Sequence, residues 1–274
     1  MSQQLLKSVV FTVFVLVGLT TTQLCAQATH HPEIDRTVAT PLESLRPGLT
    51  TDHIVRELLA HNEQRKAALV EYESQRTYRV VDLKGKVHAE EIGRMEFHAP
   101  DKKTFVVTSE SGSGLIRHLA LNPLIASETE VASGKERHDS AIAPENYTFT
   151  LLGEQQLGPR RCFVMQAVPK RNDKYLFEGK VWIDVEDYAV ARIEGHPAKK
   201  LSFWIERADF VRQYQKIGGF WLPQRDETLV QVRMYGKKML TIDHQDYIVK
   251  GVGPANNEFT TASEARTPSV IGVR

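Results

Sequence analysis

The chain has 274 residues, of which 25% are charged, and a formal net charge of +1. Basic and acidic residues alternate and form no long run, which excludes the basic stripe expected of a protein that binds nucleic acid. A chain of this length can bury the core of one large domain or of two small ones.

The N-terminus has the pattern of a secretory signal peptide. A single charge, Lys7, precedes an apolar run over residues 9–19, and a small-x-small cleavage pattern follows at residues 26–28. The apolar run is too short for a bilayer-spanning helix, which needs roughly 20 residues. We therefore expect an exported, periplasmic protein with a signal peptide over residues 1–28. An uncleaved anchor and lipidation at Cys25 are the alternatives.

Cleavage after residue 28 changes both charge and cysteine content. It removes Lys7 and Cys25, so the remaining chain of about 246 residues (274 less 28) has a formal net charge of zero and one cysteine, Cys162. No intramolecular disulfide is then possible. Cys162 stands in the apolar stretch 162–165, which favours a buried, inert thiol over a nucleophile.

Composition divides the mature chain into three parts. Residues 29–48 contain several prolines and little apolar periodicity, and residues 251–274 are rich in glycine, asparagine, serine and threonine. Such segments do not bury enough apolar surface to stay ordered, so we expect a flexible arm and a flexible tail. The ordered domain should run over residues 49–250.

The domain opens with a predicted helix. Thr50, Thr51 and Asp52 offer N-cap and first-turn chemistry, and apolar residues then recur at helical spacing. We expect the helix to lie on a sheet, to end near Tyr72, and to extend its long basic side chains outward along the rim. The apolar residues of this face are Ile54, Val55, Leu58, Leu59, Leu69 and Val70.

Strands and a helical insertion follow. Thr77–Leu83 is rich in β-forming residues, and the alternation around Met95 and Phe97, a turn at residues 99–102 and a return over Thr104–Thr108 indicate a hairpin. The period then changes to that of a helix, so we expect one or two short helices between residues 115 and 133.

The remainder of the domain is predicted to be strand. Several breaks between the strands are too short for a crossover helix, so successive strands should pair antiparallel as a meander. We count about ten strands in one sheet of a mainly β (α+β) fold, and a twisted sheet of that width tends to curl. The strands after Pro144 are Tyr147–Leu152, Cys162–Val168, Leu176–Val185, Ala189–Glu194, Leu201–Tyr214, Phe220–Tyr235 and Met239–Val249.

Alternation along the strands separates a strongly apolar face from a mixed one. The apolar face beneath the helix makes either a filled core or an apolar cleft, and the pattern does not distinguish the two. A set of aromatic residues either forms a ligand platform or packs the sheet. These are Trp182, Trp204, Tyr214, Phe220 and Trp221.

Motifs for catalysis and metal binding are missing from the sequence. It contains no G-x-S-x-G, H-E-x-x-H or P-loop motif and no zinc-type Cys/His spacing. The acidic cluster Asp184, Glu186 and Asp187 lacks the Gly and the closing Glu of an EF-hand loop, which favours a solvated hairpin tip over a calcium site. We therefore predict no catalytic residue, no metal site and no cofactor.

Two motifs carry a resemblance to a known family. Trp182-Ile183-Asp184 ends one strand before a short turn and a strand containing Arg192, and residues 219–223 read G-F-W-L-P. These resemble the W-[IV]-D hairpin and the G-x-W-x-P step of the outer-membrane lipoprotein-sorting superfamily, the LolA/LolB-like proteins. The resemblance covers roughly residues 50–250.

The resemblance implies an incomplete antiparallel β-barrel with an N-terminal helix and the short helical insertion as a lid over an apolar hollow. It implies an exported carrier that binds the acyl chain of a lipid or lipoprotein without catalysis. An envelope-stress sensor or sigma-factor regulator that binds a membrane-protein partner is the alternative, and an envelope hydrolase is a third. The implied ligand-binding residues are Val181, Ile183, Phe203 and Ile205.

Overall fold

The computed structural model describes residues 42–43, 48–130, 138–200, 203, 205–234 and 236–253. The predicted signal peptide, most of the predicted arm and nearly all of the predicted tail lie outside this range. Three arm residues, Leu42, Glu43 and Gly48, are placed, and Glu43 forms an antiparallel bridge with Glu154, which brings that part of the arm against the sheet.

The described chain consists of one long helix, a short helical insertion and ten strands. The helical elements are α2 (Thr51–Ala68), α3 (Gly114–Ile116), the π-helical turn η1 (Arg117–Leu121) and α4 (Asn122–Thr129). The strands are β1 (Leu69–Asp82), β2 (Val87–His98), β3 (Lys102–Gly112), β4 (Tyr147–Leu157), β5 (Arg160–Pro169), β6 (Phe177–Asp184), β7 (Val190–Pro197), β8 (Ile205–Ile217), β9 (Phe220–Val232) and β10 (Gly236–Val252).

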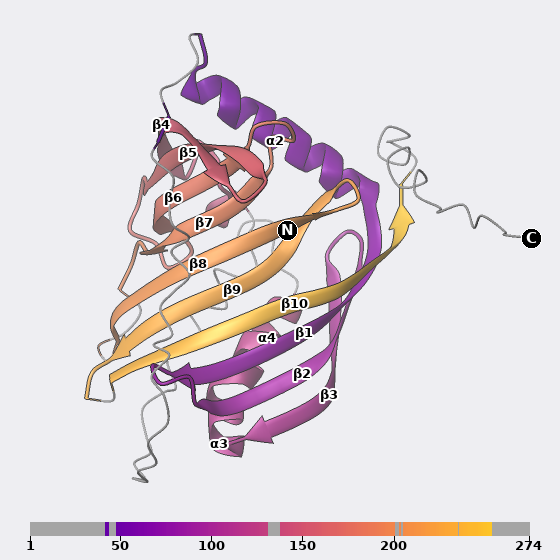
Figure 1. The fold of residues 1–274 in the computed structure, drawn as a ribbon, viewed down its shortest axis with the longest axis vertical. Coiled ribbons are helices and arrows are strands. Elements are labelled where there is room, and N and C mark those ends of the chain that lie inside the picture. Colours follow the sequence, from indigo (N-terminus) through magenta and orange to yellow (C-terminus); the bar gives the residue numbers. More distant parts are fainter. Residues whose placement is uncertain are drawn as a thin grey trace, which may run out of the picture.

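All ten strands form a single antiparallel sheet in the order β3-β2-β1-β10-β9-β8-β7-β6-β5-β4. The sheet is open, with β3 and β4 at its two edges, and this confirms the predicted mainly β, incomplete-barrel class. The order consists of two meanders, β1 to β3 and β4 to β10, joined by the pairing of the first and last strands, β1 and β10. Figure 1 shows α2 crossing one end of the sheet, while α3 and α4 lie against the strands at the other end.

Helix α2 begins as predicted and ends earlier than predicted. The Thr50 hydroxyl accepts a hydrogen bond from the backbone N–H of His53, which is an N-cap. The helix ends at Ala68, not near Tyr72, because the following residues are drawn into the sheet as β1, where Leu69 pairs with Val252. Tertiary strand pairing overrides local helix propensity here.

The helical insertion lies where the sequence predicts it. Ser113 caps α3 by accepting from the backbone N–H of Ile116, and α3, η1 and α4 then follow without a break. Leu121 and Leu124 are fully buried and pack on a cluster that includes Tyr78 of β1. The insertion is therefore packed firmly on the sheet.

Strand β8 starts later than predicted. It begins at Ile205, and Phe203 lies in the turn before it, 65% exposed. The Arg233 guanidinium stands 4.4 Å from the centre of the Phe203 ring. The apolar residues at the start of the expected run therefore do not share one buried face, since the alternation applies only where the chain is extended. Leu201 and Trp204 lie outside the described residues.

The main core lies beneath the N-terminal half of α2. Ile54, Val55 and Leu58 of the helix pack against buried residues of the sheet, among them Val181 and Ile183 of β6. This part of the predicted apolar face is a filled core. Within the described residues, no helix is both long and apolar enough to cross a membrane.

Candidate functional site

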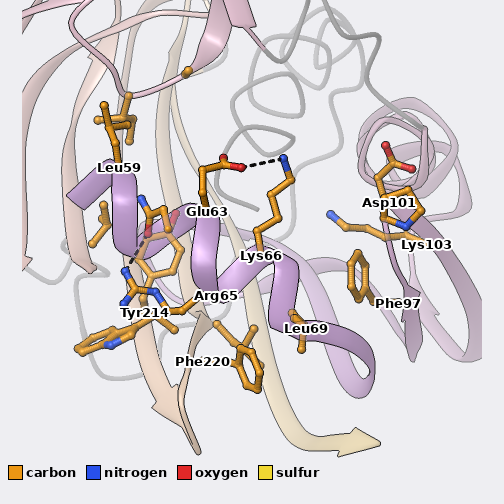
Figure 2. Close-up of a pocket in the computed structure, with 17 residues that line it drawn as sticks. Leu59, Glu63, Arg65, Lys66, Leu69, Phe97, Asp101, Lys103, Tyr214 and Phe220 are labelled. Atoms are coloured by element: carbon orange, nitrogen blue, oxygen red, sulfur yellow. Dashed lines mark hydrogen bonds and ion pairs between the residues drawn. The ribbon is translucent and has the colours of Figure 1, made fainter. Parts of the chain in front are cut away.

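A cavity of about 250 Å³ lies beneath the C-terminal half of α2. Figure 2 shows the helix side chains on one side of it and those of the sheet on the other. Its walls come from α2, from strands on both sides of the sheet centre and from the segment before β4. The lining residues are Leu59, Asn62, Glu63, Arg65, Lys66, Leu69, Phe97, Pro100, Asp101, Lys103, Ala141, Ile142, Val190, Tyr214, Phe220, Trp221 and Leu222.

The inner wall of the cavity is apolar. Leu69, Phe97, Phe220 and Leu222 are buried and belong to one hydrophobic cluster, drawn from β1, β2 and β9. The Phe97 ring stacks on Tyr72 with 5.1 Å between ring centres, which fixes its orientation. The sheet beneath α2 is thus filled at one end of the helix and hollow at the other.

The mouth of the cavity is polar. Asn62, Glu63 and Lys66 are exposed on α2, and the Lys66 ammonium lies 3.8 Å from the Glu63 carboxylate. Across the mouth, Asp101 and Lys103 come from the β2–β3 turn and the start of β3. An apolar interior with a few polar groups at the opening is the usual composition of a small-molecule site.

Arg65 connects helix α2, which forms one wall of the cavity, to the β6–β7 turn of the sheet. Its guanidinium donates to the carbonyl oxygens of Asp187 (2.8 Å) and Tyr188 (2.9 Å) and to the side-chain oxygen of Asn62 (3.0 Å). Burial lowers the pKa of Arg65, and the neighbouring Asp187 and Asp184 carboxylates oppose that shift. The expectation that basic side chains of this helix extend outward is therefore wrong for Arg65, because backbone carbonyls within reach satisfy its donors.

Replacing Arg65 by methionine should loosen this end of α2. The substitution leaves the Asp187 and Tyr188 carbonyls without their charged donor, at a cost of about 1–3 kcal/mol. Hydrogen exchange should accelerate across the second half of α2, measured residue by residue. The Arg56→Met variant is the control, since Arg56 is exposed on the same helix, and equal exchange in the two variants would contradict the anchoring role.

The β6–β7 turn that receives Arg65 is built by the W-I-D motif. The Asp184 carboxylate is buried, accepts from the backbone N–H groups of Glu186 (3.0 Å) and Asp187 (2.8 Å), and forms a two-pronged pair with Arg160 (2.7 and 2.9 Å). Trp182 points to the other face and donates to Gln155 (2.7 Å). The motif therefore fixes the geometry of the turn.

Asp187 links this turn to the cavity wall. Its carboxylate accepts from Trp221 (2.9 Å) and Lys216 (2.9 Å). Burial opposes ionisation, yet these hydrogen bonds and the charges of Lys216 and Arg160 hold the pKa of Asp187 below its usual value. Its stabilising contribution is present above the unfolded-state pKa, near 3.9, and is lost as the pH falls through the folded value. The expected solvated hairpin tip is thus an ion network.

A layer of buried polar groups separates the cavity from the cluster under α4. Glu128 of α4 forms an ion pair with Arg76 of β1, and the Tyr78 hydroxyl donates to the same carboxylate (2.9 Å). Arg212 and Asp226 form a second buried ion pair, to which His244 is hydrogen-bonded (2.9 Å). Burial lowers the pKa of His244, so this layer consists of two compensated pairs and a neutral imidazole at pH 7.

The four residues predicted to bind ligand do not meet at the cavity. Val181 and Ile183 lie in the filled core, Ile205 belongs to a separate cluster on β8 and β9, and Phe203 is exposed. None of the four lines the cavity. Their assignment as ligand-binding residues stays a prediction.

Sequence reasoning found part of the cavity wall and missed another part. Of the aromatic set, Tyr214, Phe220 and Trp221 line the cavity. Phe97 and Lys103 were missed because they come from the first hairpin, which reaches this site only through the pairing of β1 with β10. Alternation alone signals the face of a strand, and no local pattern signals which distant strand lies beside it.

The described residues offer neither a reactive cysteine nor a cluster of metal ligands. Cys162 is fully buried, and burial raises the pKa of its thiol to about 12, so it is an inert core residue. Among the described residues, no group of three or more histidine, cysteine, aspartate or glutamate side chains could hold a metal ion. The site is therefore an apolar cavity with charged side chains at its mouth.

Comparisons with known proteins give likenesses of fold. No family model matches the sequence, and no curated protein matches it either. In structure the chain is similar to a LolA superfamily protein from Nitrosomonas europaea, at 10% identity and a TM-score of 0.34, covering 75% of this chain and 96% of that one.

Two further solved structures have the same low identity of 10%. An outer membrane lipoprotein-sorting protein domain from Vibrio parahaemolyticus has a TM-score of 0.40 and covers 76% of this chain and 96% of its own. The MucA/MucB complex of Pseudomonas aeruginosa has a TM-score of 0.28 and covers 70% of this chain and 93% of its own. The W-I-D and G-x-W-x-P motifs indicate a resemblance to this same lipoprotein-sorting superfamily.

Proposed function

We propose that the protein is an exported, periplasmic carrier that holds an acyl chain of a lipid or lipoprotein in the cavity beneath α2, without catalysis. The observation that carries the proposal is the cavity itself, which has an apolar inner wall and a polar mouth. Its volume of about 250 Å³ is a little below the roughly 300–1,000 Å³ of small-molecule sites, which suits a single chain.

The hydrophobic effect supplies the binding energy in this proposal. Each methylene transferred from water to the apolar wall contributes about 0.8 kcal/mol. A chain of twelve methylenes could therefore contribute roughly 10 kcal/mol before the costs of association are subtracted. Release requires the helix to move away from the sheet. The hydrogen bonds of Arg65 to the β6–β7 turn are the polar contacts that would break.

Native mass spectrometry of gently purified protein tests the proposal. We expect a co-purified acyl species near one per protein, because an acyl chain would cover the apolar wall of the cavity. Replacing Leu59 by tryptophan should fill the cavity from the helix side and lower acyl-chain affinity at least tenfold. The control is Leu152→Trp on edge strand β4, which does not line the cavity. Unchanged binding in Leu59→Trp would contradict this site.

Partner binding is a second candidate function, as in a sensor or regulator that contacts a membrane protein. Edge strand β3 favours it, because Val106 and Val107 are 46% and 43% exposed on a strand with one unpaired edge. Such an edge can accept an extended segment of another chain. A pull-down from membranes tests it: capture that is lost when Val107 is replaced by proline would support this candidate over the carrier.

A further inference from the structure

Three cationic side chains line the cavity, and two of them have partners. Arg65 is bound to two carbonyl oxygens and an amide oxygen, and Lys66 lies beside the Glu63 carboxylate. Lys103 differs from both: within the described part of the chain, its ammonium has no hydrogen bond and no ion pair. Among the described residues, the cavity therefore presents one cation without a hydrogen-bonded or ion-paired partner.

Lys103 is positioned to act inside the cavity. It lies directly opposite Phe97 in the β2–β3 ladder and is only partly exposed. Figure 2 shows its side chain extending towards α2 across the Phe97 ring. Its charge is thus presented at the mouth of the cavity, next to the apolar wall.

The surrounding charges do not compensate Lys103. Arg76 on β1 and Arg212 on β8 repel it, Glu128 on α4 attracts it, and both arginines already have their own buried carboxylate partners. Burial, followed by the charge of Arg76, lowers the pKa of Lys103 to about 8. The side chain is therefore still mostly protonated at pH 7, with an unfavourable desolvated charge that an anion would relieve.

We propose that the cavity selects an amphiphile with an anionic headgroup, a carboxylate or a phosphate, whose charge pairs with the Lys103 ammonium while its hydrocarbon chain packs on Phe97, Leu69 and Phe220. The proposal rests on the proposed carrier function and adds the headgroup class. A charge-assisted hydrogen bond in a partly desolvated site contributes about 1.5–3 kcal/mol, a preference of roughly tenfold to a hundredfold over an uncharged headgroup.

A series of C12 probes tests this selectivity. Binding of dodecanoate, dodecyl phosphate, dodecanol and inorganic phosphate is measured by calorimetry at pH 7, below the critical micelle concentrations, on the full mature chain. Wild-type protein should bind dodecanoate or dodecyl phosphate tenfold to a hundredfold more tightly than dodecanol. The stronger of the two identifies the headgroup as carboxylate or phosphate.

The variant Lys103→Met should remove that preference, measured as the ratio of dodecanoate affinity to dodecanol affinity. Lys102→Met is the matched control, because Lys102 is the neighbouring residue on β3, is exposed and does not line the cavity. It should retain the full preference. A preference that survives in Lys103→Met overturns the inference.

A measurement on wild-type protein tests the inference even if the Lys103→Met variant fails to fold. Raising the pH from 7 to 9.5 removes the Lys103 proton in the empty cavity, so the preference of wild-type protein for dodecanoate over dodecanol should fall at least fivefold. The other charged side chains around Lys103 are guanidiniums (Arg76, Arg212) and carboxylates (Glu63, Asp101, Glu128), two classes whose ordinary pKa values lie outside this interval. A preference that does not change between pH 7 and 9.5 overturns the inference.

The outcomes separate the two proposals. Equal affinity of wild-type protein for dodecanol and dodecanoate overturns the headgroup selectivity but supports the carrier function. Inorganic phosphate that binds as tightly as dodecyl phosphate supports an anion site at Lys103 and contradicts the carrier function. Failure of every C12 probe to bind contradicts both.

Discussion

Replacing Glu128 by glutamine should lower the free energy of unfolding by about 3–5 kcal/mol. Glu128 and Arg76 are both almost fully buried and form an ion pair, and Tyr78 donates to the same carboxylate. Burial works against the Arg76 charge, yet the Glu128 carboxylate holds the pKa of Arg76 well above its ordinary value. The glutamine amide keeps the shape of the side chain but carries no charge. Arg76 is then a buried charge without a counter-ion, which is strongly destabilising.

Urea denaturation of the full chain measures this effect. The control is Glu130→Gln, since Glu130 is exposed just beyond the end of α4 and should change stability by less than about 0.5 kcal/mol. A loss of less than 1 kcal/mol in Glu128→Gln would mean that the interior solvates Arg76 in some other way.

This ion pair bears on which element can act as a lid. The insertion is held to the sheet by Glu128 at one point and by Leu121 and Leu124 at others. In its second half, helix α2 is held over the cavity by Arg65 and Ala68, since its other buried apolar residues, Ile54, Val55 and Leu58, lie in its first half. Opening at the second half of α2 therefore breaks fewer buried contacts than lifting the insertion does.

The sequence predicts the fold well because short-range chemistry decides most of it. The connections between many successive strands are too short for a crossover helix, so those strands must pair antiparallel. Thr50, as an N-cap residue, marks the start of α2. The end of α2 was misplaced because Leu69 and Val70 continue the apolar helical pattern, but Leu69 pairs with Val252 of β10 and the Val70 carbonyl accepts from the backbone N–H of Ala99. That pairing joins residues far apart in the chain, and no local signal carries it.

The candidate site was less predictable for the same reason. Alternation placed Val181 and Ile183 correctly on the face beneath the helix, where they fill the core. Whether a point on that face is filled or hollow depends on which side chains of the helix stand above it. Lys103 reads in the sequence as one of several surface lysines, and only the approach of β3 to α2 brings it into the cavity wall.

The W-I-D motif illustrates how a local pattern can serve a distant site. Asp184 shapes the β6–β7 turn so that the carbonyls of Asp187 and Tyr188 face Arg65 and the Asp187 carboxylate reaches Trp221. The motif is thus a structural support for the helix that covers the cavity. Its geometry supports the docking of α2, and none of its three side chains lines the cavity.

Replacing Asp184 by alanine should therefore weaken both the fold and the cavity. The carboxylate accepts four hydrogen bonds, two from backbone N–H groups and two from Arg160, so we expect a loss of about 2–4 kcal/mol. Acyl-chain affinity should fall in parallel, because Arg65 loses the ordered carbonyls that hold α2. Asp184→Asn, which keeps an acceptor for the backbone N–H groups but loses the charge, should fall between alanine and wild type.

Urea denaturation measures the loss of stability, and hydrogen exchange across α2 measures the loosening of the helix over the cavity, in the same variants. Glu186→Ala is the matched control, since Glu186 lies in the same turn and its side chain is 78% exposed. That exposed charge should contribute less than about 1 kcal/mol, although it too approaches Arg160. If Asp184→Ala were destabilised without faster exchange in α2, the turn would stabilise the hairpin alone, and the link from motif to cavity would be wrong.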